Sequence, residues 1–283
     1  MAGATMKDIK RRIHSVESTK QITNAMQLVA SSKMRKARQK MEQTRPYMRI
    51  TQQVIADVAS HQMDEASPYF CENGVQRKCV VVIAGDRGLA GHYNAAVFKL
   101  ADELIDENTL VLPVGKKAVE RYSHRPCQLL DSHYVRTEQV RASDCHDMAE
   151  LLIERFLAQE CGSVMLVSTT LISALVQEAE VKTLLPVKPE PVQGPVTQMI
   201  MEPGPGAILK AIMPDYVAGV LYAAMCDAFA SEVSARRNAM DLATKNAQQM
   251  IDELSLHYNR ARQGSITQEI TEIVAGAEKY APR

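Results

Sequence analysis

The feature that most constrains the fold is a long amino-terminal stretch without glycine. No glycine occurs between Lys7 and Met63, and Pro46 is the only proline there. Large apolar side chains recur every seven residues in its second half, at Met34, Met41, Met48 and Ile55. A seven-residue period is typical of a helix that packs against another helix. At about 1.5 Å per residue this helix would be roughly 80 Å long, too long for a compact globule, although Pro46 can kink it.

The first half of the same segment carries two shorter apolar faces. These consist of Ile9, Ile13 and Val16, and then of Ile22, Met26 and Val29. Because residues three or four apart lie on one side of a helix, each set forms a single face. We expect both faces to belong to the seam of the packed helix.

A second helical segment lies at the other end of the chain. Residues 207–283 return to a helical pattern, and after Gly219 only Gly264 and Gly276 interrupt it. A heptad-like seam recurs along it, at Met240, Ala243, Ala247, Met250, Leu254 and Ala261. Two long helices at opposite ends of one chain pair most simply as an antiparallel coiled coil. We therefore expect residues 1–63 and 207–283 to form a coiled-coil shaft.

The middle of the chain changes period. Three short apolar runs, Cys79–Ala84, Leu110–Val114 and Val164–Ser168, are typical of buried strands. Helical patterns lie between them, at Ala95–Ile105 and Asp147–Gln159. Strands that alternate with helices predict an α/β, Rossmann-like domain with a mostly parallel sheet, at residues 77–186. A proline-rich connector, residues 187–206, follows this inserted domain.

The charge of the chain is zero overall but is unevenly distributed. Ten basic residues lie between positions 7 and 40, against Asp8 and Glu17 only: Lys7, Lys10, Arg11, Arg12, Lys20, Lys33, Arg35, Lys36, Arg38 and Lys40. Such a stretch fits an acidic partner surface, a solvated helix face, or nucleic acid. Nucleic-acid binding ranks second, because aromatic residues are absent before Tyr47. A helical interaction protein ranks first, and an α/β enzyme with helical arms ranks third.

No motif predicts a catalytic, cofactor or metal site. The loop GDRGLAGHYN has Gly85, Gly88 and Gly91 at every third position, which matches neither the dinucleotide-binding nor the P-loop pattern. We interpret it as a tight strand-to-helix turn. The six cysteines and seven histidines are scattered without ligand spacing. The chain start lacks the apolar core of a secretory signal, and we expect no segment with the roughly 18 apolar residues of a membrane helix.

Four segments resemble the gamma subunit family of F-type ATP synthases. The long amino-terminal motif MKDIKRRIHSVESTKQITNAMQLVASSKMRKA is Met6–Ala37, and the central loop is Gly85–Asn94. The carboxy-terminal motif, Ala230–Ala277, extends over almost fifty positions, and MEPGP at Met201–Pro205 also matches. Departures occur where Ala90 replaces a common Cys, Cys226 a common acid, Arg237 a usual Met, and Gly264 a usual Ala.

The resemblance implies a non-catalytic rotor shaft. Such a shaft stands inside a hexamer of alpha and beta subunits, and its foot sits with the epsilon subunit on the membrane ring of c subunits. Ion flow turns the ring and the shaft, and the shaft drives the beta subunits through different conformations. The lack of a transit peptide and of the paired-cysteine insertion of chloroplast members implies a bacterial protein. It would be peripheral, on the cytoplasmic face of the cell membrane, with no cofactor and no nucleic acid.

The same resemblance assigns partner contacts to individual residues. Contacts with the beta subunits are implied for the amino-terminal segment, at Met26, Lys33, Arg35 and Lys36. The carboxy-terminal stretch adds Arg262, Gln263 and Gln268, and Glu202 belongs to the foot near epsilon and the c ring. An apolar stripe of Ile266, Ile270, Ile273, Val274 and Ala277 extends past the expected end of the amino-terminal helix. We expect this tip to sit inside another protein.

Overall fold

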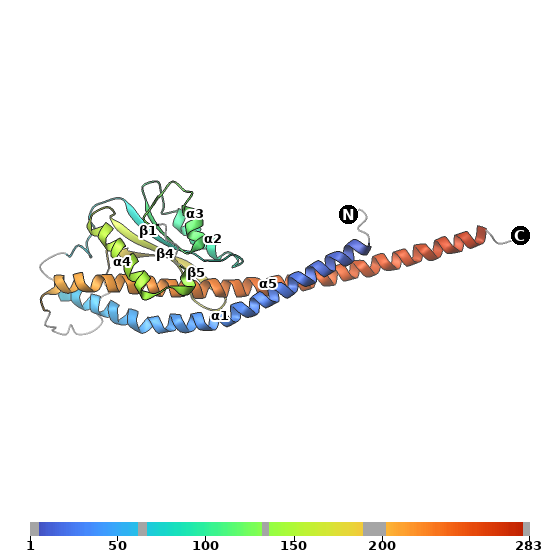
Figure 1. Ribbon diagram of the computed structural model, residues 1–283, viewed down its shortest axis with the longest axis horizontal. Coiled ribbons are helices and arrows are strands. Elements are labelled where there is room, and N and C mark those ends of the chain that lie inside the picture. The colour runs from blue at the N-terminus through green and yellow to red at the C-terminus, as the bar shows by residue number, and fades with distance from the viewer. Residues whose placement is uncertain (1–5, 62–66, 132–135, 189–201, 280–283) are drawn as a thin grey trace. The chain divides into compact units, whose positions relative to one another are not determined.

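The computed structural model describes residues 6–61, 67–131, 136–188 and 202–279. The chain divides into two compact units, residues 1–29 with 237–283, and residues 30–236. Two long helices, α1 (Met6–His61) and α5 (Pro205–Lys279), contribute residues to both units (Figure 1). The predicted long terminal helices are therefore confirmed, and α1 continues as a helix through Pro46.

A five-stranded sheet organises the unit formed by residues 30–236. Its order is β3-β2-β1-β4-β5, with all neighbours parallel except β4 and β5, which are antiparallel. In the parallel part Val80 lies beside Val111 on one side and beside Met165 on the other. The strands are β1 (Lys78–Ile83), β2 (Leu110–Val114), β3 (Gln128–Leu129), β4 (Ser163–Leu171) and β5 (Gln177–Leu185). The mostly parallel α/β fold is confirmed.

Helices cover both faces of this sheet, which explains the continuous apolar runs of its inner strands. On one face Val80 and Val82 pack with side chains of α2 (Tyr93–Asp102) and α3 (Lys116–Tyr122). The other face belongs to a larger cluster with side chains of α4 (Ala142–Leu157) and α5, including Val81, Ile83, Leu152, Leu166, Met213 and Leu221. The helix α5 is thus part of the core of the α/β domain.

Element boundaries differ from the sequence prediction at several places. Helix α4 begins at Ala142, five residues before the predicted Asp147, because the Asp144 carboxylate accepts the Arg141 N–H at 2.9 Å and caps an earlier turn. The strand β5 was not predicted. Its sequence QEAEVKT is polar, since β5 lies at the edge of the sheet, where side chains stay in water.

The expectation that no segment is apolar enough to span a membrane was wrong, because one helix meets the length and composition of a membrane span. Helix α5 contains an 18-residue window of mean hydropathy 1.3, of which 39% is buried inside the protein. One such helix is weak evidence for a membrane span, since core helices of soluble proteins have the same composition. Here Leu209, Met213, Val217, Leu221 and Met225 recur every fourth residue and are buried. This stripe packs into the core of the α/β domain.

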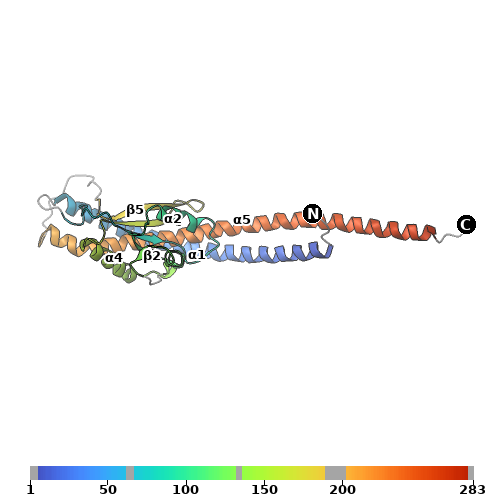
Figure 2. The same cartoon turned by 90° about the horizontal axis from the view of Figure 1, so that it is seen from above.

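In the other unit, the first part of α1 and the last part of α5 lie side by side and antiparallel (Figures 1 and 2). The predicted seam was wrong at Ile22, Val29 and Met250, which are 58%, 58% and 47% exposed. Thr23 is buried instead, and Ile251 is half-buried. The residues that face the partner helix follow a regular spacing of four and three, from Ile9 through Ile13, Val16 and Lys20 to Thr23. This spacing places Thr23 in the seam although it is polar.

Candidate functional site

Three polar contacts fix how α1 and α5 are paired in the unit formed by residues 1–29 and 237–283. The Lys20 ammonium contacts the Gln248 amide oxygen, and the Thr23 and Thr244 hydroxyls are 2.8 Å apart. The Gln27 amide donates to the Asp241 carboxylate at 2.9 Å. The seven residues from Lys20 to Gln27 on α1 are thus matched by the seven from Gln248 back to Asp241 on α5.

Helix α5 continues beyond the start of α1. Extending the pairing from Lys20 back to Met6 places Met6 opposite Arg262 on α5. Residues from Gln263 to Lys279 therefore have no part of α1 beside them (Figure 2). The expected carboxy-terminal overhang is present.

The apolar stripe lies on this overhang and is open to solvent. The side chains of Ile266, Ile270 and Ile273 are 44%, 56% and 71% exposed, and Val274 is also exposed. The side chain of Ala277 lies outside the described residues. Exposed aliphatic side chains at three- and four-residue spacing form one face of a helix, and such a face marks an interaction site when nothing in the chain covers it.

The polar residues expected near the tip are exposed on the same helix. Within the described residues, Arg262 makes no ion pair and Gln268 donates only to Glu272, one turn along, at 2.9 Å. The Gln263 carbonyl accepts the Thr267 hydroxyl at 2.9 Å. All three polar side chains are thus available to a partner.

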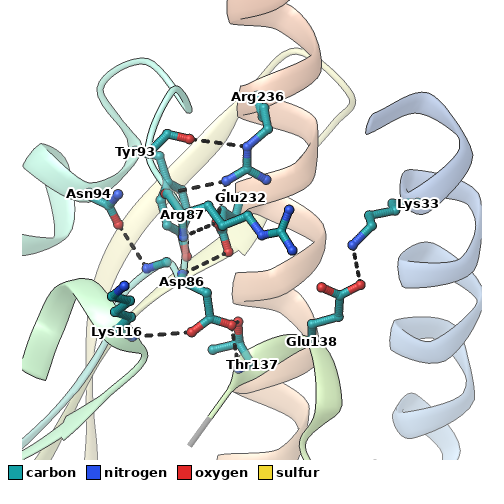
Figure 3. Close-up of polar contacts among 12 residues, drawn as sticks. Lys33, Asp86, Arg87, Tyr93, Asn94, Lys116, Thr137, Glu138, Glu232 and Arg236 are labelled. Atoms are coloured by element: carbon teal, nitrogen blue, oxygen red, sulfur yellow. Dashed lines mark hydrogen bonds and ion pairs between the residues drawn. The ribbon is translucent and has the colours of Figure 1, made fainter. Parts of the chain in front are cut away.

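The basic residues of α1 do not behave alike. Lys33 is held by an ion pair with Glu138, which lies just before α4 (Figure 3). Arg35 and Lys36 are exposed and, among the described residues, form no ion pair. Met26 is half-buried on the neighbouring stretch of α1. Within the expected basic contact, only Arg35 and Lys36 present uncommitted charge.

Glu202 stands apart from the other expected contacts. Its side chain is exposed, three residues before α5 begins, and a cis peptide bond joins it to Pro203. Most of the predicted connector, residues 189–201, lies outside the described residues. Glu202 therefore stays a predicted contact.

The central loop between β1 and α2 is fixed to α5 by a buried carboxylate. Glu232 is 2% exposed and accepts the backbone N–H groups of Arg87 at 3.1 Å and Asp86 at 3.4 Å. Its other partner is the guanidinium of Arg236, one turn along α5, whose side chain is 12% exposed. Arg236 also donates to the Gly88 carbonyl at 3.3 Å. The predicted strand-to-helix turn is confirmed, but it is also anchored to α5 (Figure 3).

Further hydrogen bonds extend this anchor through the domain. The Asp86 carboxylate accepts the Lys116 N–H at 3.3 Å and the Thr137 N–H at 3.1 Å. The Tyr93 hydroxyl donates to the Ala228 carbonyl of α5 at 3.1 Å, and burial raises the pKa of this hydroxyl far above its usual value. A side chain at Gly85 would come within 2.9 Å of the Glu232 carboxyl carbon. The loop is thus shaped to fit Glu232 closely.

A family model described as ATP synthase matches residues 5–279 of the chain. An ATP synthase gamma chain from Ruminococcus albus is 45% identical over 277 residues, covering 95% of this chain and 96% of its own. The chain belongs to the ATP synthase gamma-chain family. The sodium-ion-specific gamma chain of Acetobacterium woodii is 36% identical, covering 96% of this chain and 98% of its own.

Solved structures agree on the fold of this gamma chain. A chain of the Euglena gracilis mitochondrial ATP synthase rotor superposes with a TM-score of 0.65 at 16% identity, covering 92% of this chain and 98% of that one. A chain from the central stalk and c ring of the Tetrahymena thermophila enzyme gives a TM-score of 0.59 at 21% identity, with 78% and 99% covered.

The described part of the gamma chain contains no group of three or more residues suited to hold a metal ion. At the first of the positions noted above, Ala90 of the central loop is buried beside Tyr93 and Ala235. At Gly264 a side chain would meet open space. Glycine rather than alanine in a helix costs about 1 kcal/mol of helix stability, and here it removes no contact.

Sequence reasoning missed the residues that anchor the loop. Glu232 and Arg236 lie one helical turn apart within a run of small residues. This spacing is typical of an ordinary exposed ion pair on a helix, so it did not indicate a buried anchor. A carboxylate flanked by Ser231, Val233 and Ser234, in a stretch of α5 rich in small and apolar residues, was the available signal.

Proposed function

We propose that this gamma chain is the central shaft of an ATP synthase, turning with the membrane ring and acting on the beta subunits through its helices. The observation that carries the proposal is the α5 overhang, whose aliphatic face has no cover in the described chain. Leaving one large aliphatic side chain in water forgoes roughly 1.5–3 kcal/mol. A sleeve of apolar partner surface removes that cost.

An apolar sleeve also suits rotation. Apolar contacts are non-directional, so they hold an axle in place without fixing its angle. Arg262, Gln263 and Gln268 supply the polar contacts that vary with angle. Arg35 and Lys36 face acidic surface on the beta subunits, and Glu202 lies with the epsilon subunit and the c ring.

The gamma chain itself carries out no chemistry in this proposal. It changes the conformations of the beta subunits by rigid rotation, which is allostery rather than catalysis. The complex is membrane-associated, and we place this chain on the cytoplasmic face of a bacterial membrane, held there by its partners. Nothing favours the alternative of a coiled-coil nucleic-acid binder.

Hydrogen exchange tests the proposal directly. Backbone amides from Gln263 onward should exchange rapidly in the free chain and become protected when alpha and beta subunits are added. Amides of the paired stretch around Gln248 serve as the internal control, since α1 already covers them. Equal protection of the tip in both states would refute the proposal that a partner sleeve covers it. Failure to assemble with alpha and beta subunits would refute the proposed role as a shaft.

A further inference from the structure

A cleft lies between α1 and the end of the sheet formed by β4 and β5. Its volume is about 990 Å³, and residues of α1, β4, β5 and α5 line it. Cavities of about 300–1,000 Å³ are the size of small-molecule sites. None of the predicted contact residues and no part of the central loop lines this cleft.

Basic side chains stand on two opposite walls of the cleft. Arg45 and Arg49 are one turn apart on α1, and in the described residues neither forms an ion pair. Across from them are Lys182 of β5 and Lys188, of which Lys182 is paired with Glu180 at 2.7 Å. Like charges one helical turn apart destabilise a helix slightly, and an anion between them removes the repulsion.

The inner wall carries two polar groups without partners. Asp227 of α5 is half-buried, and its carboxylate makes no hydrogen bond within the described chain. Burial raises the pKa of this carboxyl group, against the opposing effect of Lys182 and Arg45. Ser168 of β4 is 2% exposed, lines the cleft and also lacks a hydrogen bond to the described residues. Both residues line the cleft, so a ligand in it can reach their polar groups.

We propose that this cleft binds a hydrogen phosphate group, either free inorganic phosphate or the end of a small phosphorylated molecule. The phosphate oxygens accept hydrogen bonds from Arg45, Arg49 and the Ser168 hydroxyl. The P–OH group donates to the Asp227 carboxylate. One ligand of this kind, which has both acceptors and a donor, can pair with all four of these groups.

Asp227 gives the site a chemical selectivity that can be measured. Sulfate resembles phosphate in shape but carries no proton at neutral pH, so it has nothing to donate to Asp227. A carboxylate left facing an unprotonated oxyanion repels it, since both are negative. The cleft should therefore accept phosphate and reject sulfate.

Isothermal titration calorimetry of the full chain tests this, with sodium phosphate, sodium sulfate and glycerol phosphate titrated at equal ionic strength. We expect phosphate to bind at least about tenfold more tightly than sulfate, the difference expected when a charge-assisted hydrogen bond is lost. The comparison of phosphate with glycerol phosphate identifies the source of the group. Comparable binding of phosphate and sulfate, or no binding of either phosphate compound, would overturn the proposal.

Three variants connect the signal to the cleft. R45Q/R49Q should weaken phosphate binding by about tenfold or more, as charge-assisted hydrogen bonds are lost. K10Q/R12Q removes the same charge from exposed positions of α1 outside the cleft and should bind normally. D227N should bind phosphate and sulfate alike. Circular dichroism melts without phosphate check that each variant is folded, and an equal loss in K10Q/R12Q would refute the site.

Discussion

Replacing the three isoleucines of the α5 overhang with glutamine should weaken assembly without destabilising the chain. The variant is I266Q/I270Q/I273Q. Together, the exposed surface of these three side chains equals that of about 1.7 fully exposed isoleucine side chains, and a partner can cover it. At roughly 1.5–3 kcal/mol per buried side chain, the loss on binding is about 2.5–5 kcal/mol. That corresponds to an affinity lower by roughly 70- to 4,000-fold, since 1.4 kcal/mol is tenfold.

The assay compares the free chain with the assembled complex. Thermal unfolding of the free variant should change little, because surface substitutions are usually within about 0.5 kcal/mol and glutamine favours helix. Affinity for the hexamer of alpha and beta subunits should drop as calculated. The matched control is Leu157→Gln on α4, which removes an aliphatic side chain of similar exposure (42%) outside the overhang. Unchanged affinity of the triple variant, or an equal loss in the control, would refute the argument.

Three further predictions follow from the charged groups. R35E/K36E should reduce ATP-driven ion pumping by the assembled complex while either single change does little, because exposed pairs contribute about 0–1 kcal/mol each; normal pumping by the double variant would contradict this. Glu232→Ala should lower the free energy of unfolding by about 3–5 kcal/mol in urea titration, since it leaves the Arg236 charge and two N–H groups buried without their partner, and a change under 1 kcal/mol would argue against the anchor. Burial raises the pKa of Asp102, but hydrogen bonds from Arg121 and other neighbours outweigh it and lower the pKa overall. The contribution of Asp102 to the free energy of unfolding is therefore present above the unfolded carboxyl pKa and is lost as pH falls through the lower folded pKa. In acid titrations, the free energy of unfolding of Asp102→Asn should fall less with decreasing pH than that of the unaltered chain.

Much of the architecture could be predicted because its signals are local. The seven-residue spacing from Met34 to Ile55 and the apolar run at Cys79–Ala84 report helix and strand without knowledge of the rest of the chain. The seam near the amino terminus could not be predicted by polarity, since Thr23 occupies a buried position while Ile22 faces out. Register depends on the partner helix, and the partner is more than two hundred residues away.

The candidate site shows the same division. Exposure of the isoleucine stripe at the tip could be predicted, because it depends only on the unequal lengths of two helices. The anchoring of the central loop could not, since the distance between Arg87 and Glu232 in sequence hides their contact. Likewise, the ion pair between Lys33 and Glu138 shows that a run of similar charges can have different roles along one helix.

The polar contacts between α1 and α5 have a consequence for how deep the tip can reach. An apolar seam allows paired helices to slide by a whole heptad at modest cost, whereas polar layers permit only the alignment in which each group meets its partner. The three layers from Lys20 to Gln27 would all be broken by such a slide. By fixing the register of the two helices, they set the length of α5 that extends unpaired beyond Met6. A gamma chain with those layers made apolar would keep its helices but lose a defined length of unpaired α5.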